Sequence, residues 1–97
     1  MAQVVYAATA LANLERAFDT LHDLGADDAA LAAVEAIRSA VSMLEHHPLI
    51  GRIVSGELRE LVISYGRTGY VALYRYVAAR DQVRVLAIRH QRELDYP

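Results

Sequence analysis

The last third of this 97-residue chain is the part that most restricts how it can fold. It contains three runs rich in aliphatic, β-branched and tyrosine residues, at positions 57–65, 70–77 and 82–90, and short turns around 66–69 and 78–81 separate them. β-Branched and aromatic residues favour extended strands, and connections this short join antiparallel neighbours. The sequence therefore predicts a three-stranded antiparallel meander in this third of the chain.

Both faces of the predicted sheet are apolar. Successive side chains of a strand point to opposite faces. The middle run therefore divides into one face with Tyr70, Ala72, Tyr74 and Tyr76 and a second face with Val71, Leu73 and Val77. Because an apolar face has to be covered, we expect the rest of the chain to cover one face. The other face is then either a shallow core of its own or a docking surface for a partner.

The first half of the chain predicts a short strand followed by two amphipathic helices. Residues 3–6 form the expected strand. Apolar residues then recur at helical spacing in two stretches. They are Leu11, Leu14, Phe18 and Leu21 in the first stretch and Leu31, Val34, Ile37, Val41 and Leu44 in the second.

Capping residues mark the expected ends of these helices. Thr9 is expected to cap the first helix and Asp27 or Asp28 the second, because their side-chain oxygens can accept a hydrogen bond from a free backbone N–H. Gly25 suits the left-handed residue that ends the first helix. We therefore predict one α+β domain over residues 1–97, in which an N-terminal strand, a helical hairpin and the three-stranded antiparallel meander form one sheet covered by helices.

The composition excludes several classes of protein. The chain has no cysteine, so neither a disulfide nor a thiolate zinc site can form, which fits a reducing cytoplasm. His46 and His47 point about 100° apart on a helix and have no third ligand nearby, which argues against a zinc site. The N-terminus lacks the basic start of a signal peptide, and no apolar run approaches the ~20 residues of a membrane span. We expect a cytoplasmic protein with no metal, no cofactor and no membrane contact.

The charge is divided unevenly along the chain. Residues 1–50 hold two arginines against seven acidic residues, whereas residues 51–97 hold eight arginines against five. All ten basic residues are arginine, which is typical of a GC-rich genome. A basic C-terminal half also fits an anionic partner, either a nucleic acid or an acidic segment of another protein.

Four short motifs carry a resemblance to a known family. They are PLIGR at 48–52, LREL at 58–61, GYVALYR at 69–75 and VLAIRH at 85–90. In this order and spacing the chain resembles the RelE/ParE superfamily of bacterial toxins, and more closely its ParE branch, whose members stabilise plasmids. The resemblance implies the toxin of a type II toxin–antitoxin system, which inhibits growth by binding DNA gyrase. It also implies a cognate antitoxin whose flexible C-terminal segment wraps the toxin.

The RelE branch looks like a set of ribosome-dependent messenger ribonucleases, and this is the alternative function. The resemblance implies lysines on one strand of the meander and an arginine just after the Gly-Tyr pair. This chain has Val62, Ser64 and Val71 at or near those positions. Because an aliphatic side chain can neither move a proton nor stabilise an oxyanion, no catalytic residue is favoured. A third alternative is an inert relative that is retained only as an antitoxin partner.

A ribonuclease built on this chain would have to use other residues. The candidates are His90, Arg92, Arg59, Arg75 and Tyr96. As a histidine near the end of the last strand, His90 could act as a general acid or base near neutral pH. It could equally end its strand by hydrogen-bonding a backbone group. Arg92 and Tyr96 resemble, in rough register, a phosphate-binding arginine and a tyrosine of the enzymatic branch.

Several of the same residues are candidates for contacts with the antitoxin or the target. This set is Arg59, Arg75, Arg89, Arg92 and Tyr74. We expect Arg59 and Arg75 either to form structural ion pairs across strands or to bind a carboxylate of the antitoxin. The expected structural partners are Glu57 and Glu60. Arg52, which follows the Pro-Leu-Ile-Gly segment, is expected to pin that loop.

Overall fold

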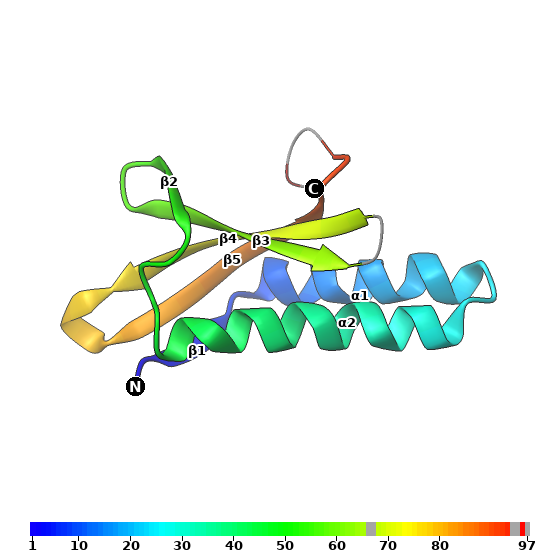
Figure 1. The fold of residues 1–97 in the computed structure, drawn as a ribbon, viewed down its shortest axis with the longest axis horizontal. Coiled ribbons are helices and arrows are strands. Elements are labelled where there is room, and N and C mark those ends of the chain that lie inside the picture. The colour runs from blue at the N-terminus through cyan, green and yellow to red at the C-terminus, as the bar shows by residue number, and fades with distance from the viewer. Residues whose placement is uncertain (66–67, 94–95, 97) are drawn as a thin grey trace.

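The computed structural model describes residues 1–65, 68–93 and 96, and it has two layers (Figure 1). One layer is a five-stranded sheet, and the other is a pair of helices packed on one face of it. The strands are β1 (Gln3–Tyr6), β2 (Arg52–Ser55), β3 (Leu58–Tyr65), β4 (Thr68–Val77) and β5 (Gln82–His90). The helices are α1 (Ala8–Asp23) and α2 (Asp27–Ser42), and single 3-10 turns follow at Met43–Glu45 and Ala78–Arg80. None of the described helices is long and apolar enough to cross a membrane.

The predicted α+β class is confirmed, but the predicted sheet was incomplete. The strand order is β1-β5-β4-β3-β2, in which β1 runs parallel to β5 and all other neighbours are antiparallel. The consecutive hairpins β3-β4-β5 correspond to the predicted meander. The sequence missed β2, because this strand has only four residues, all of them exposed, and gives no alternating pattern. The predicted turn at 66–69 falls partly on residues 66 and 67, which lie outside the described residues.

The helices pack on the sheet through alanines more than through leucines. The buried residues are Ala10, Asn13 and Leu14 in α1 and Ala30, Ala33, Ile37 and Val41 in α2. Leu11 and Leu31 were expected to be buried but are 49% and 55% exposed. Alanine lets the two helices and the sheet approach closely, so the buried stripe is rotated toward the alanines and away from these two leucines.

The predicted side-chain caps are wrong, whereas the role of Gly25 is confirmed. α1 begins one residue before Thr9, α2 has Ala26 at its N-cap, and neither helix has a side-chain cap hydrogen bond. Asp27 and Asp28 lie in the first turn of α2, where a negative charge stabilises the helix N-terminus. Gly25 has a φ of +77°, the left-handed conformation that ends α1.

A β-bulge in β5 changes which of its side chains share a face. The register between β4 and β5 shifts at Leu86, which has no paired residue on β4. Val85 faces the helices before the shift, and the buried Ile88 faces them after it. His90 is therefore on the helix side of the sheet, and Arg89 points to the opposite side.

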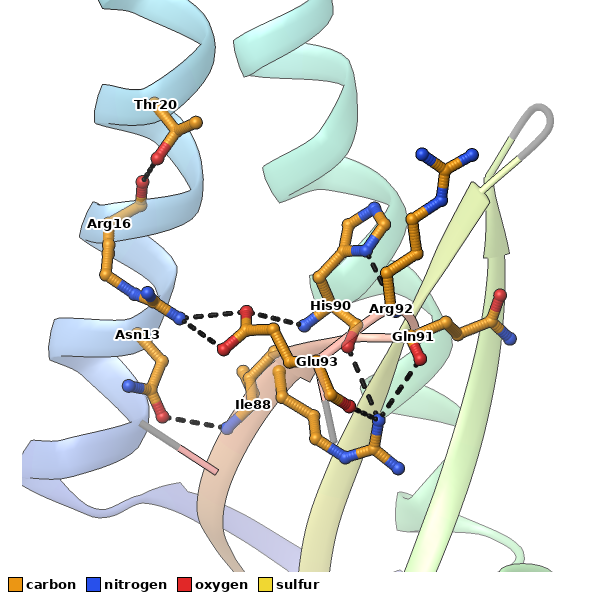
Figure 2. Close-up of polar contacts among 9 residues, drawn as sticks. Asn13, Arg16, Thr20, Ile88, His90, Gln91, Arg92 and Glu93 are labelled. Carbon is orange, nitrogen blue, oxygen red and sulfur yellow. Dashed lines mark hydrogen bonds and ion pairs between the residues drawn. The ribbon is translucent and has the colours of Figure 1, made fainter. Parts of the chain in front are cut away.

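The buried side chain of Asn13 joins α1 to β5 at the point where β1 ends. β1 pairs with β5 only as far as Tyr6 and Val85, so the N–H of Ile88 lies beyond its reach. The Asn13 side-chain oxygen accepts a hydrogen bond from that N–H at 2.9 Å (Figure 2). A buried amide is stable here because it satisfies a backbone group that would otherwise be left without a partner.

Candidate functional site

The face of the sheet opposite the helices, called the open face below, is the candidate functional surface (Figure 1). Side-chain alternation places on it three rows of residues that are directly paired across β3, β4 and β5. These rows are Leu58, Arg75 and Arg84; Glu60, Leu73 and Ala87; and Val62, Val71 and Arg89. The open face therefore combines an aliphatic centre with arginines at both ends.

A buried carboxylate, Glu60, in the middle row of the open face, is the centre of a polar cluster. Its Oε1 accepts a hydrogen bond from Nη2 of Arg52 at 2.8 Å, and its Oε2 accepts one from the hydroxyl of Tyr96 at 2.5 Å. A guanidinium nitrogen of Arg89 lies 3.7 Å from Oε2, and that guanidinium lies over the Tyr96 ring, 5.2 Å from its centroid. Glu60, Arg52, Arg89 and Tyr96 form what is called the Glu60 cluster below.

The pKa shifts in the Glu60 cluster oppose proton transfer near neutral pH. Burial alone would raise the pKa of Glu60, but the hydrogen bonds from Tyr96 and Arg52 and the nearby charge of Arg89 hold that pKa below its usual value. Burial raises the pKa of Tyr96, and the adjacent Glu60 carboxylate raises it further. Glu60 is thus a stable anion, and Tyr96 keeps its proton.

Two of the three positions in the row Val62, Val71 and Arg89 lack the groups that phosphodiester cleavage needs. Val62 and Val71 are paired with each other on β3 and β4, and Val71 is also paired with Arg89. Val62 is 49% exposed, so a group bound on this face would meet an aliphatic side chain there. Arg89 is the cation in this row, and it lies within the Glu60 cluster.

A second polar cluster lies at the end of β5, on the helix side (Figure 2). Nη2 of Arg16 on α1 donates to both carboxylate oxygens of Glu93, at 2.9 and 3.0 Å. The backbone N–H of His90 donates to Glu93 Oε1 at 3.2 Å, and the backbone N–H of Arg92 donates to Nδ1 of His90 at 3.1 Å. The rings of His90 and Tyr70 pack in a T-shaped arrangement, with centroids 5.3 Å apart. His90 therefore ends its strand by hydrogen-bonding a backbone group.

A cavity also lies on the helix side, between α1 and the end of β5. It has a volume of about 610 Å³. Its polar lining residues are Asn13, Arg16, Thr20, Arg89, His90 and Glu93. Among these, Arg16 and Glu93 are bound to each other, and Asn13 is bound to β5. Among the described residues, no group of three or more His, Cys, Asp or Glu side chains could hold a metal ion.

The candidate ribonuclease residues do not converge on one site. Arg75 lies on the open face, and Tyr96 reaches it through Glu60, whereas His90 lies on the helix side. Arg59 also alternates away from the open face, since its strand neighbour Glu60 points there. The side chain of Arg92 is exposed beyond the end of β5.

Arg52 and Arg59 have roles opposite to those expected. Arg52 forms the cross-strand ion pair with Glu60, whereas Arg59 pins the loop. Nη1 of Arg59 donates to the carbonyl oxygens of Leu49 at 3.1 Å and Gly51 at 2.9 Å. Because Arg59 holds a loop of its own chain, its proposed contact with a partner loses support.

Tyr74 is a core residue whose hydroxyl holds the same loop. Its side chain is fully buried, and its hydroxyl accepts a hydrogen bond from the N–H of Gly51 at 2.8 Å. Burial raises its pKa. In this structure the ring has no exposed surface to offer to an antitoxin or a target.

The sequence missed the Glu60 cluster and the pairing of Arg84 with Arg75. The cluster depends on β2, which brings Arg52 opposite Glu60, and on Tyr96, whose hydroxyl donates a hydrogen bond to Glu60. Arg84 could have been found, because the turn at 78–81 already implied that Arg84 and Arg75 lie close together on adjacent strands.

A family model described as "ParE toxin of type II toxin-antitoxin system, parDE" matches residues 4–95. This chain belongs to that family of toxins.

The proteins that are similar to the chain include a curated toxin and a chain of known structure. One is "Toxin RelE3" of Caulobacter vibrioides, 40% identical over 68 residues, which are 70% of this chain and 72% of the relative. The other is a solved chain from the "Chromosomal ParDE TA system from P. aeruginosa", with a TM-score of 0.78 and 24% identity. That match covers 93% of this chain and 96% of the solved one, and at this identity it supports the fold alone.

Proposed function

We propose that this toxin acts in the cytoplasm by binding and inhibiting DNA gyrase, without cleaving a bond, and that a cognate antitoxin neutralises it. The observation that carries the proposal is the row Val62, Val71 and Arg89. For RNA cleavage the resemblance implies strand lysines and an arginine at or near Val62, Ser64 and Val71, and two of these three positions are aliphatic. Cleavage by a 2′-hydroxyl needs a base, and none of the described open-face groups is free to act as one.

The neighbouring groups support the same proposal. Tyr96 keeps its proton because Glu60 accepts a hydrogen bond from it, so it is a poor general base. His90 lies across the sheet from Tyr96. A surface of this kind can still bind a protein target through exposed aliphatic and arginine side chains.

The alternative is a ribosome-dependent messenger ribonuclease. One observation favours it, namely that Arg89 and Tyr96 are in contact on the open face. One relative also carries the name toxin RelE3. In such an enzyme Arg89 would stabilise the phosphate and Tyr96 would have to leave Glu60.

The test compares the two targets directly with purified toxin. We expect inhibition of DNA supercoiling by purified gyrase and no cleavage of messenger RNA on translating ribosomes. His90→Ala should inhibit gyrase within about twofold of the parent protein, because His90 is engaged in ending β5. Ribosome-dependent cleavage with no effect on gyrase would overturn the proposal, and so would a purified, folded toxin that affects neither target.

A further inference from the structure

Two arginines lie side by side on the open face, and none of the described carboxylates pairs with them. Arg75 of β4 and Arg84 of β5 are directly paired. Within the part of the chain that the structure describes, no carboxylate oxygen lies within 4.0 Å of either guanidinium. Like charges directly opposite each other destabilise a sheet. The chain therefore keeps a destabilising pair at this place.

Two acidic groups near the arginine pair, Glu60 and Asp81, are already engaged. Glu60, one row along the open face, is bound by Arg52 and Tyr96. Asp81, beside the turn Ala78–Arg80, accepts a hydrogen bond from the Tyr76 hydroxyl at 2.6 Å. Neither is directed at the arginine pair, which leaves its two guanidinium groups available to an external anion.

Two shallow depressions flank the arginine pair, and both are lined by it. The larger, of about 430 Å³, is otherwise lined by Val5, Ala7, Leu58 and Leu86. The smaller, of about 310 Å³, is otherwise lined by Val77, Arg80 and Gln82. One depression thus has an aliphatic floor, and the other carries a third arginine. A ligand that fills both depressions therefore needs an apolar group next to a negatively charged one.

We propose that Arg75, Arg84 and Arg80 bind carboxylates of an acidic segment of the antitoxin, and that an aliphatic side chain of the same segment fills the depression lined by Leu58 and Leu86. This inference rests on the proposed function in taking a cognate antitoxin as the partner. Guanidinium groups bind carboxylates through two parallel hydrogen bonds, which suits a fixed arginine pair. No aromatic residue lines either depression, so the platform on which nucleic-acid bases stack is missing.

The test measures antitoxin affinity for matched charge variants. Arg75→Gln and Arg84→Gln each remove one charge from the arginine pair, and Arg38→Gln removes one from an exposed position on α2. The probe is the protein encoded next to the toxin, titrated at low and at physiological salt. We expect Arg75→Gln and Arg84→Gln each to bind the antitoxin about tenfold more weakly than the parent and with a shallower salt dependence. Arg38→Gln should bind it with an affinity within about twofold of the parent's.

A second readout separates binding from folding. Removing one of two opposed like charges should leave the Tm of the free toxin unchanged or raise it. Parent-like antitoxin affinity in Arg75→Gln and Arg84→Gln would overturn the inference. A loss of affinity matched by a fall in Tm would also overturn it, since the arginines would then act in folding. If the two variants lose binding to a duplex DNA oligonucleotide but keep their antitoxin affinity, the arginine pair binds nucleic acid instead.

A charge exchange identifies the partner residue. Arg84→Glu should abolish tight binding, and an antitoxin in which the contacting acidic residue is changed to arginine should restore it. The gyrase assay on the same variants distinguishes this inference from the proposed function. If the variants inhibit gyrase and bind the antitoxin as tightly as the parent does, the antitoxin-binding role of the arginine pair is refuted and the gyrase proposal stands. If the variants bind the antitoxin more weakly but the parent toxin does not inhibit gyrase, gyrase is refuted as the target and the antitoxin-binding role of the arginine pair stands.

Discussion

Gly51→Ala is expected to lower the free energy of unfolding by about 3 kcal/mol. A Cβ atom at this position would lie 2.6 Å from both Cε1 and the hydroxyl oxygen of Tyr74, and 2.8 Å from the carbonyl oxygen of Glu60. Tyr74 is fully buried and Glu60 lies within β3, so neither can move without disturbing the core. The midpoint of urea-induced unfolding measures the effect.

Gly56→Ala is the matched control for this substitution. A Cβ atom at Gly56 would meet nothing within 4 Å, but the residue has a φ of +55°. Its replacement should therefore cost only backbone strain, about 1 kcal/mol. Equal losses of stability for the two variants would show that Gly51 does not pack against Tyr74 as described.

Glu60→Gln is expected to destabilise the protein by about 2 kcal/mol at pH 7. The amide keeps the shape of the side chain but leaves Arg89, whose side chain is 15% exposed, without its counter-charge. The pKa of Glu60 is lowered on folding from its ordinary value of 4.5. The contribution of the Glu60 carboxylate to the free energy of unfolding is therefore fully present above pH 4.5. It is lost as the pH falls through the lowered pKa of the folded state. The stability difference between the parent and Glu60→Gln should shrink in that acidic range.

Two variants serve as controls for Glu60. Arg52 has a side chain that is 65% exposed, so Arg52→Gln should cost less than about 1 kcal/mol. Glu57→Gln changes an exposed carboxylate in the residue before β3 and should leave the unfolding midpoint nearly unchanged from pH 3 to 7. A pH-independent loss in Glu60→Gln, or one no larger than that of Arg52→Gln, would contradict the role assigned to the buried carboxylate.

Local sequence patterns predicted most of the fold. The strands in the last third were found to within a few residues, because their β-branched and tyrosine content is dense and their turns are short. β2 was missed because its four exposed residues acquire a strand conformation only by pairing with β3. The alanine-lined helix face was missed for a related reason, since the hydrophobic pattern alone gives leucine more weight than alanine.

The candidate site was harder to predict because one residue in β5 changes its geometry. Regular alternation along β5 would place His90 on the same face as Arg84 and hence Arg75. The bulge at Leu86 exchanges the faces and sends Arg89 to the open face in place of His90. No residue pattern within β5 signals this bulge. The exchanged roles of Arg52 and Arg59 likewise depend on β2, which the sequence did not predict.

The most direct test of the central claim is a pulse-labelling experiment in bacteria just after expression of this chain is induced. Thymidine and leucine incorporation are followed side by side in the same culture. A gyrase inhibitor should reduce thymidine incorporation first, while leucine incorporation continues. An earlier fall in leucine incorporation would contradict the account and indicate a ribonuclease that uses Arg89 and Tyr96 on the open face.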